Sequence, residues 1–447
     1  MLCVLKKWCD LDQQILVPKK LSATRGWYPG YVLTVLGLVS ILNYYDRNLI
    51  TILVEPMKRD LHLSDSDIGL LTGIGFALMY SILGIPMARL ADRHGRARVL
   101  AAALAVWSLM TVLSGRAIDF TTMLLARAGV GIGEAGGLPA THALVADYFS
   151  PASRGRALSV IGICGGLGIS LALAGGGLIN DWRGWRIAFY LGGLPGLLLS
   201  GLVLFTVRER ESMNPLVTAR QPAIKLQTVF VTLWRRRSYV HLCIGLGIAA
   251  IGAYGQFAWT PAFLMRSYHL SAGLAGSYYS AAVGPATMIA VFIGGALNDW
   301  LVKRDRRWPF WLLAFCFAVN VPASLILFLV HNFALAMTMT LLTTVVGSLW
   351  VAPSYAIVQN LAGPQMRAIA AAIYMMIVNI VGLGLGPYVT GLLSDALTPK
   401  WGDSALAVSL CWVTMTCAVG VVSFLFATRT VAADMDEALT MPGGTAR

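Results

Sequence analysis

The sequence predicts an all-helical integral membrane protein in which twelve membrane-spanning helices form two pseudo-symmetric halves of six. Hydrophobic residues make up 57% of the 447 positions and charged residues only 12%, whereas a soluble domain carries about 25% charged residues. Apolar segments long enough to cross the ~30 Å hydrocarbon core of a bilayer recur along the whole chain. A polar, basic stretch near the middle separates the first six of these segments from the last six.

Each apolar run is expected to be helical from end to end, because a helix satisfies all its backbone polar groups within lipid. The predicted spans are 31–54, 68–90, 98–115, 120–145, 156–180, 187–207, 239–265, 272–299, 308–330, 333–360, 367–396 and 405–428. The chain then divides into an N-terminal arm (1–29), a first six-helix bundle (30–207), a linker (208–238), a second six-helix bundle (239–428) and a tail (429–447).

The distribution of Lys and Arg predicts the orientation. With the N-terminus inside, 25 of the 34 basic residues fall in cytoplasmic segments and seven in outer loops, as the positive-inside rule requires. The same bias explains the net charge of +13 without any nucleic-acid partner. Leu2–Leu5 is too short for the apolar core of a secretory signal. We therefore expect a multi-pass protein of the plasma (inner) membrane with both termini in the cytoplasm.

The two predicted halves repeat weakly in sequence. Pro139 and Pro353 lie 214 positions apart, and the same spacing relates Asp181 to Asp395. Two parallel repeats with a binding site at their interface are typical of secondary transporters. We expect such a protein to act as a monomer and to carry its substrate through the bilayer between the halves.

Several other classes of protein are disfavoured. The chain has no GxxxxGK[ST] motif for ATP, no HExxH zinc motif and no GxSxG nucleophile elbow, so we expect neither an enzyme nor catalytic residues. The seven cysteines form no CxxC pair or other metal-ligand spacing, so we expect no metal and no cofactor. A receptor-like sensor that kept the fold but lost transport is an alternative, and the intramembrane charges described below disfavour it.

Three stretches of the first half carry a family resemblance. Residues Ala88–Arg98 resemble the loop that characterises the major facilitator superfamily, with Ala88 where a Gly is usual. Asn43–Arg47 and Arg127–Ala140 are similar to the Spinster-type lipid transporters within that superfamily. Organic-anion symporters share the Asp-Arg pair of the first stretch and the Glu-Ala pair of the second. The resemblance implies a proton-coupled transporter that works by alternating access.

Four charged residues lie well inside predicted spans, away from their ends: Asp46 and Arg47 in the first, and Arg127 and Glu134 in the fourth. Charges at a helix centre cost at least ~2.5 kcal/mol each, so they are functional candidates. Asp46 and Arg127 are both expected ~12 Å below the outer face, where they could pair, with Glu134 ~10 Å deeper on the face of Arg127. We predict a proton relay through Asp46, Arg127 and Glu134. The alternatives are a structural salt bridge and, for Arg47, a side chain that reaches the outer interface.

The loop after the second span is the candidate gate. The resemblance implies that Asp92, Arg93, Gly95 and Arg96 brace the cytoplasmic ends of helices in the outward-open state. Asp92 could pair with a helix N-terminus or a nearby Arg. The alternative is a short basic turn that serves orientation alone.

Polar and aromatic residues in the spans are candidates for substrate binding, although each could instead be a packed side chain. They are Arg47, Tyr45, His142, Tyr254, Gln256, Trp259, Tyr355, Tyr374 and Asn379. The aromatic content and the resemblance favour a small amphipathic substrate of lysolipid or sphingolipid type. The alternatives are an organic anion such as a sugar acid, with Arg127 or Arg47 as its anchor, and a drug in an exporter.

Overall fold

The computed structural model describes residues 26–209, 226–363 and 365–440, which form helices and short connections. In the first half the helices are α2 (Trp27–Ile52), α3 (Val54–Leu61), α4 (Asp65–Thr72), α5 (Ile74–His94), α6 (Arg96–Ser114), α7 (Phe120–Tyr148), α8 (Pro151–Ser170), the π-helical turn η1 (Leu171–Gly175), α9 (Gly176–Arg183) and α10 (Trp185–Thr206). In the second they are α11 (Leu226–Arg235), α12 (Arg237–Tyr268), α13 (Ala272–Val302), α14 (Trp308–Leu329), α15 (Phe333–Leu349), α16 (Val351–Ala362), α17 (Arg367–Ile377), the π-helical segment η2 (Val378–Gly384), α18 (Leu385–Trp401), the 3₁₀ turn η3 (Gly402–Ser404), α19 (Ala405–Thr414), α20 (Thr416–Ala427) and α21 (Val431–Thr440).

All twelve predicted spans are helical in the structure. Within the described residues, nine helical stretches are long and apolar enough to cross a membrane, and one of them, 367–427, runs through two predicted spans. The helices α2 and α7, which carry the intramembrane charges, are not among the nine. The protein is therefore an integral membrane protein, and the count of twelve crossings stays a prediction.

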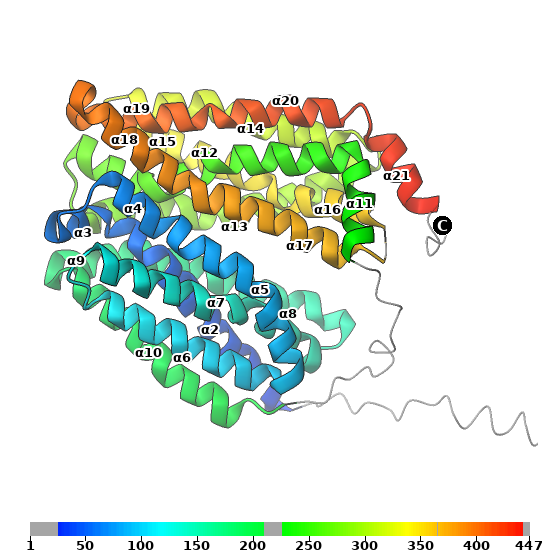
Figure 1. Ribbon diagram of the computed structural model, residues 1–447, viewed down its shortest axis with the longest axis horizontal. Helices are drawn as coiled ribbons and strands as arrows, with labels where there is room; N and C mark the ends of the chain where they lie inside the picture. Colours follow the sequence, from blue (N-terminus) through cyan, green and yellow to red (C-terminus); the bar gives the residue numbers. More distant parts are fainter. Residues whose placement is uncertain (1–25, 210–225, 364, 441–447) are drawn as a thin grey trace, which may run out of the picture.

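The helices form two groups that meet at one end and diverge toward the other (Figure 1). At the end that carries α3, α4, α9 and α18, one continuous apolar core contains side chains from both groups, among them Phe189 and Phe263. Toward the other end the buried core splits into one cluster around Trp107 and a second around Phe317, each built from a single group. Within the described residues, the core that both groups share therefore lies at the first end, while toward the other end Leu383 of η2 packs against the cluster of the first group.

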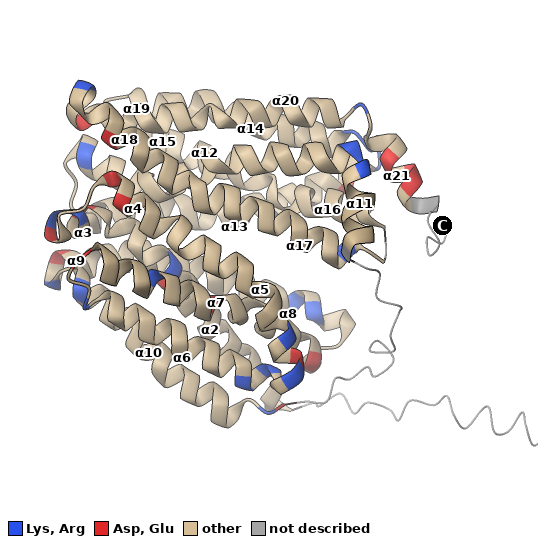
Figure 2. Ribbon diagram, viewed as in Figure 1, with Lys and Arg blue, Asp and Glu red and all other residues tan. Residues whose placement is uncertain are grey.

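Charged residues concentrate at the two ends of the helices, and the middle of the molecule is almost free of them (Figure 2). We call the end with Glu55, Asp65, Asp181, Arg266 and Asp395 the outer end, because the positive-inside rule predicts that it faces outward. The opposite end, which contains the turn at Gly95 and the start of α12, is called the inner end.

Three helices lie in segments for which no helix was predicted, and the first of them, α3, occupies the loop between the first two predicted spans. α11 lies within the predicted linker, whose residues 210–225 are outside the described part, and Figure 1 shows it running across the ends of the other helices. α21 occupies the predicted tail. Asp434 of α21 accepts hydrogen bonds from the backbone N–H (2.8 Å) and the hydroxyl (2.5 Å) of Ser238. The first turn of α12 thereby gains an acceptor for an N–H that has no partner within the helix.

Candidate functional site

The four intramembrane charges come together between α2 and α7. Asp46 and Glu134 are fully buried and Arg127 is 1% exposed. The side chain of Arg47 is 20% exposed. Burial of this kind requires compensation by partners, because an isolated ionised group in an apolar interior is unstable by several kcal/mol.

Arg47 is the partner of Glu134. Its Nε and Nη2 both donate to Oε2 of Glu134, at 2.9 Å and 2.6 Å. The guanidinium also lies against aromatic rings, 4.6 Å from the centroid of Tyr80, 5.0 Å from that of Phe76 and 5.7 Å from that of Tyr44. Cation–π attraction of this kind adds to the ion pair in a site with little water. The expectation that Arg47 reaches the outer interface is therefore wrong for this conformation.

Asp46 and Arg127 do not form the ion pair that we expected. Nη1 of Arg127 donates to the backbone oxygen of Asp46 at 3.3 Å, and its guanidinium lies 5.6 Å from the Phe76 ring centroid. Among the described residues, the Asp46 carboxylate has no hydrogen bond of acceptable geometry. Its polar neighbours are Trp107 and Thr111 of α6. Successive residues of a helix are separated by ~100°, so Asp46 points into the first bundle while Arg47 points away from α6.

Tyrosines of both halves lie near Arg47. Tyr254 of α12 lies in the neighbourhood of Arg47, Tyr44 and Tyr80. Tyr355 of α16 lies in the neighbourhood of Tyr254, Tyr44 and Tyr80. Tyr44, Phe76 and Tyr80 were missed at the sequence level. The spacing of Tyr44 and Arg47, which are three residues apart on one helix face, could have revealed the first of them.

Several predicted substrate residues lie away from this tyrosine cluster. Tyr45 is 9% exposed and directs its hydroxyl at the Ala188 carbonyl, 3.5 Å away. Trp259 is 1% exposed and donates to the Pro387 carbonyl at 2.9 Å. Both side chains pack toward the outer end, in the core shared by the two halves. His142 is exposed on α7.

Others lie within the second half. Gln256 is buried, and its amide donates to the Thr414 hydroxyl at 2.9 Å. Asn379 belongs to η2 and is half-buried. The Tyr355 and Tyr374 rings meet edge-on with centroids 5.6 Å apart, and Tyr374 donates to Ser354 at 2.8 Å.

Ion pairs tie the two halves together at the outer end. Arg266 of α12 donates to Asp65 through Nη1 (2.8 Å) and Nη2 (2.7 Å), and to Glu55 through Nε (2.7 Å). Asp65 also accepts from Lys58 (2.5 Å) and Ser394 (2.6 Å). Such bidentate, charge-assisted bonds are among the stronger polar contacts in proteins. They connect α3 and α4 of the first half with α12 and α18 of the second.

Two aspartates, one from each half, add hydrogen bonds between the halves at the outer end. Asp395 of α18 accepts from the backbone N–H groups of Asp65 (3.0 Å) and Ser66 (2.7 Å) at the start of α4. Asp181 of α9 accepts from the Gly273 N–H (2.9 Å) at the start of α13. Asp181 and Asp395 are the pair that the sequence repeat relates. Each caps a helix of the other half, where a carboxylate is favoured by the helix dipole.

The predicted gate loop lies at the inner end, and within the described part of the chain its bonds stay in its own half. Gly95 ends α5 at φ +98°, a conformation in which a side chain would be strained. Arg96 donates to Asp147 at 2.5 Å and to Asp92 at 3.4 Å, and the Asp92 side chain is 67% exposed. Glu209 accepts from the backbone N–H of Arg96 at 3.1 Å. Arg93 is exposed. In this conformation Asp92 is therefore weakly bonded.

The family follows from comparison with known proteins. The family model of the Major Facilitator Superfamily matches residues 36–387. The chain belongs to the major facilitator superfamily. It is 38% identical to an MFS-type efflux pump of Mycolicibacterium smegmatis over 84% of this chain and 87% of the pump. It is 28% identical to a probable L-galactonate transporter of Escherichia coli, over 60% of this chain and 61% of that protein.

The conformation of this chain can be compared with that of a solved structure. The crystal structure of a bacterial homologue of the human lysosomal transporter Spinster, in an inward-facing and unoccupied conformation, superposes with a TM-score of 0.82 at 27% identity. The match covers 91% of this chain and 98% of that one. The protein is thus a Spinster-like transporter of the superfamily rather than an enzyme, and its closed outer end agrees with an inward-facing arrangement.

Proposed function

We propose that this protein is a proton-coupled transporter of a small amphipathic molecule of lysolipid or sphingolipid type, in which the Arg47–Glu134 pair couples proton binding to alternating access. The observation that carries the proposal is the contact itself. A buried carboxylate and a guanidinium from two different helices are joined at 2.6 Å, beside a cluster of tyrosines from both halves.

The chemistry follows from what a proton does to this pair. Protonation of Glu134 removes its negative charge and with it most of the attraction for Arg47, which then needs another anionic partner. An anionic headgroup of a substrate would supply that partner, with the aromatic rings of Phe76 and Tyr80 beside it. Proton binding at Glu134 would thus favour binding of the anionic headgroup at Arg47. Asp46, an unbonded buried carboxylate within the described residues, is the proposed second proton carrier.

The substrate class is supported by two features. The rings around Arg47 offer apolar area next to one positive charge, which suits a molecule with an anionic head and an apolar body. The efflux pump that is 38% identical handles export, and an exporter of drug-like amphipathic molecules would use the same features. We further propose a plasma-membrane location with both termini in the cytoplasm.

A second candidate is the symport of an organic anion such as a sugar acid. It is favoured by the fork of Arg47, which can hold a carboxylate through two parallel bonds, and by the similarity to a probable L-galactonate transporter.

The test uses Glu134→Gln, which mimics the protonated residue, in purified protein reconstituted into liposomes. We expect gradient-driven flux to fall at least tenfold, while substrate exchange without a gradient and the melting temperature stay within a few degrees of the original protein. Asp436→Asn, which removes a carboxylate from an exposed pair with Arg306, is the matched control and should change neither. A Glu134→Gln protein that still accumulates substrate in response to a pH gradient would refute the coupling role. A large loss of melting temperature with proton-dependent residual flux would support a structural salt bridge instead.

A further inference from the structure

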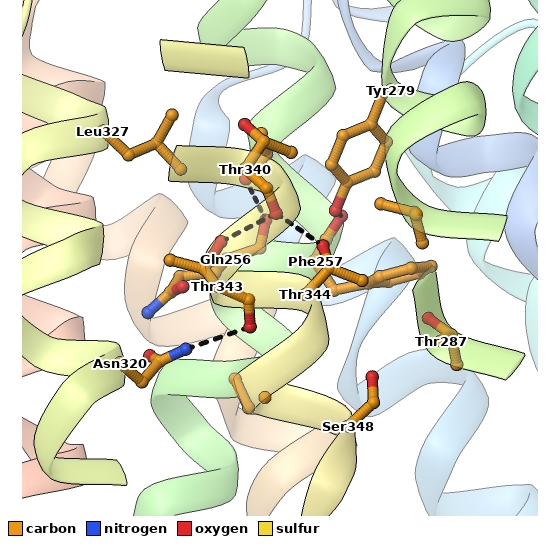
Figure 3. A pocket seen from close by; sticks show the side chains of 14 residues that line it. Gln256, Phe257, Tyr279, Thr287, Asn320, Leu327, Thr340, Thr343, Thr344 and Ser348 are labelled. Carbon is orange, nitrogen blue, oxygen red and sulfur yellow. Dashed lines mark hydrogen bonds between the residues drawn. The ribbon is translucent and has the colours of Figure 1, made fainter. Parts of the chain in front are cut away.

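A cavity with several polar side chains lies inside the second half, apart from the Arg47–Glu134 pair. It measures about 110 Å³ and is bounded by α12, α13, α14 and α15. Figure 3 shows polar side chains from three of these helices directed into it, among them Gln256, Asn320, Thr340, Thr343 and Thr344. None of the fourteen residues that line it carries a charge. Its lining is therefore neutral, with hydroxyl and amide groups set among apolar side chains.

The hydrogen bonds of the lining determine what it can bind. Thr340 donates to the Ala336 carbonyl (2.9 Å), and both Thr343 (3.0 Å) and Thr344 (2.7 Å) donate to the Thr340 carbonyl. These hydroxyls have therefore used their protons and offer lone pairs to a ligand. The Asn320 amide donates one proton to the Thr343 carbonyl at 3.3 Å and has a second. Such a mixture of many acceptors and few donors suits a hydroxyl group, which both donates and accepts.

The cavity lies at the position in the second half that corresponds, by the sequence repeat, to the Arg47–Glu134 pair of the first half. Tyr44 and Tyr254 lie 210 positions apart, and that spacing relates Arg47 to Phe257. The spacing of 214 between Pro139 and Pro353 relates Glu134 to Ser348. Phe257 and Ser348 both line the cavity. The cavity therefore lies where the first half has the Arg47–Glu134 pair and the second half has the uncharged residues Phe257 and Ser348.

The packing of Asp46, the residue next to Arg47, agrees with this correspondence between the two halves. Asp46, which the same spacing relates to Gln256, has Trp107 and Thr111 of α6 as polar neighbours. Gln256 accepts from Ser324 of α14 at 3.0 Å and donates to Thr414 of α19. α6 and α14 are the third long helices of their halves, so both side chains meet corresponding helices.

We propose that this cavity is a subsite for a neutral, hydroxyl-bearing part of the transported molecule, so that the first half recognises charge and the second half recognises hydroxyl groups. The volume of about 110 Å³ exceeds the 10–15 Å³ that one water needs. It is smaller than the pockets of 300–1,000 Å³ that enclose whole drug-sized ligands. A headgroup with two or three hydroxyls is the size that fits. The inference rests on the proposed transport function only in assigning that group to the transported molecule.

The hydroxyls could belong to a free sugar acid or to a lipid headgroup, and two pairs of probes distinguish these sources. Gluconate is compared with hexanoate, and lysophosphatidylglycerol with lysophosphatidylethanol, so that each pair differs mainly in hydroxyl groups. Binding is measured by thermal shift and by competition on the purified full-length protein. The variant is Thr343→Val with Thr344→Val, which keeps side-chain shape and removes two hydroxyls. The control is Thr338→Val, an exposed threonine of α15 with the same type of intrahelical bond.

We expect the original protein to bind the hydroxylated member of at least one pair about tenfold more tightly, because each hydrogen bond contributes ~1 kcal/mol net. The double variant should reduce that preference to within twofold and bind the other member as before, which also shows that it is folded. Thr338→Val should keep the preference. Equal binding within both pairs, including no binding, would overturn the inference, as would an unchanged preference in the double variant. Loss of proton-driven flux in Glu134→Gln is measured separately, so the proposed coupling can fail while the subsite holds.

Discussion

Removal of the Arg266 side-chain charge should open the outer end. In the structure Arg266 makes a bidentate contact with Asp65 and a further bond to Glu55, and its side chain is 18% exposed while that of Asp65 is 2% exposed. Removing one partner of a buried pair costs about 3–5 kcal/mol. Lys58 still neutralises Asp65, and water reaches Arg266 in part. We therefore expect Arg266→Gln to destabilise the closed outer end by about 2–3 kcal/mol, a roughly 30- to 150-fold shift in the conformational equilibrium.

The shift can be measured as a distance between spin labels. Arg116 and His331 are exposed residues of outer loops in different halves, and labels attached to cysteines there would report the opening by pulsed electron spin resonance. Arg266→Gln should convert much of the population to a longer separation. Arg306→Gln is the control, because it removes an arginine of the inner end whose pair with Asp436 is exposed. An unchanged distance distribution for Arg266→Gln, or an equal change for both variants, would refute the reasoning.

Three further predictions concern topology, the gate and the outer closure. A cysteine at Gln221, outside the described residues, should resist a membrane-impermeant thiol reagent in intact cells, whereas one at Ser404 should react. Labelling at Gln221 would show that the protein has the opposite orientation. Asp92→Asn should abolish most transport and leave expression and melting temperature near normal, as liposome flux and thermal unfolding will check; full flux would exclude a gating role. Gly391→Ala should prevent closure of the outer end, because its Cβ would lie 2.2 Å from a backbone oxygen of α4. Gly175→Ala is the control, because the Cβ there meets nothing within 4 Å. A spin-label distance that stays short in Gly391→Ala, or a similar opening in Gly175→Ala, would contradict this prediction.

The spans could be predicted from the sequence because hydropathy and length are enough to identify a helix in lipid. Their charges also fixed which helices carry the candidate site, since α2 and α7 hold all four intramembrane charges named from the sequence. Spacing along a helix gives relative depth, at 1.5 Å per residue. This spacing predicts that Glu134 lies deeper in the membrane than Arg127 on the same helix.

The partner choice within the site could not be predicted in the same way. Asp46 and Arg47 are adjacent, and only the rotation of α2 decides which of them meets Glu134. In a soluble helix the polar face would settle the rotation, but a membrane helix is apolar nearly all round. The same ambiguity led to Tyr45 rather than Tyr44 as a binding candidate. The ion pairs at the outer end were missed because Arg266 and Asp65 lie outside the predicted spans, and nothing local relates residues 201 positions apart.

The energetics of the outer closure have a consequence for the opposite end. A transporter must exchange between its states, so their free energies differ by only a few kcal/mol. Opening the outer end breaks the Arg266 contacts and the helix caps of Asp181 and Asp395, at a cost of at least about 2–3 kcal/mol for Arg266 alone. A proton moving down a gradient of one pH unit supplies only about 1.4 kcal/mol. Bonds of similar strength must therefore form at the inner end in the outward-open state. Asp92, which is 67% exposed and 3.4 Å from its partner here, has the unused capacity to form them.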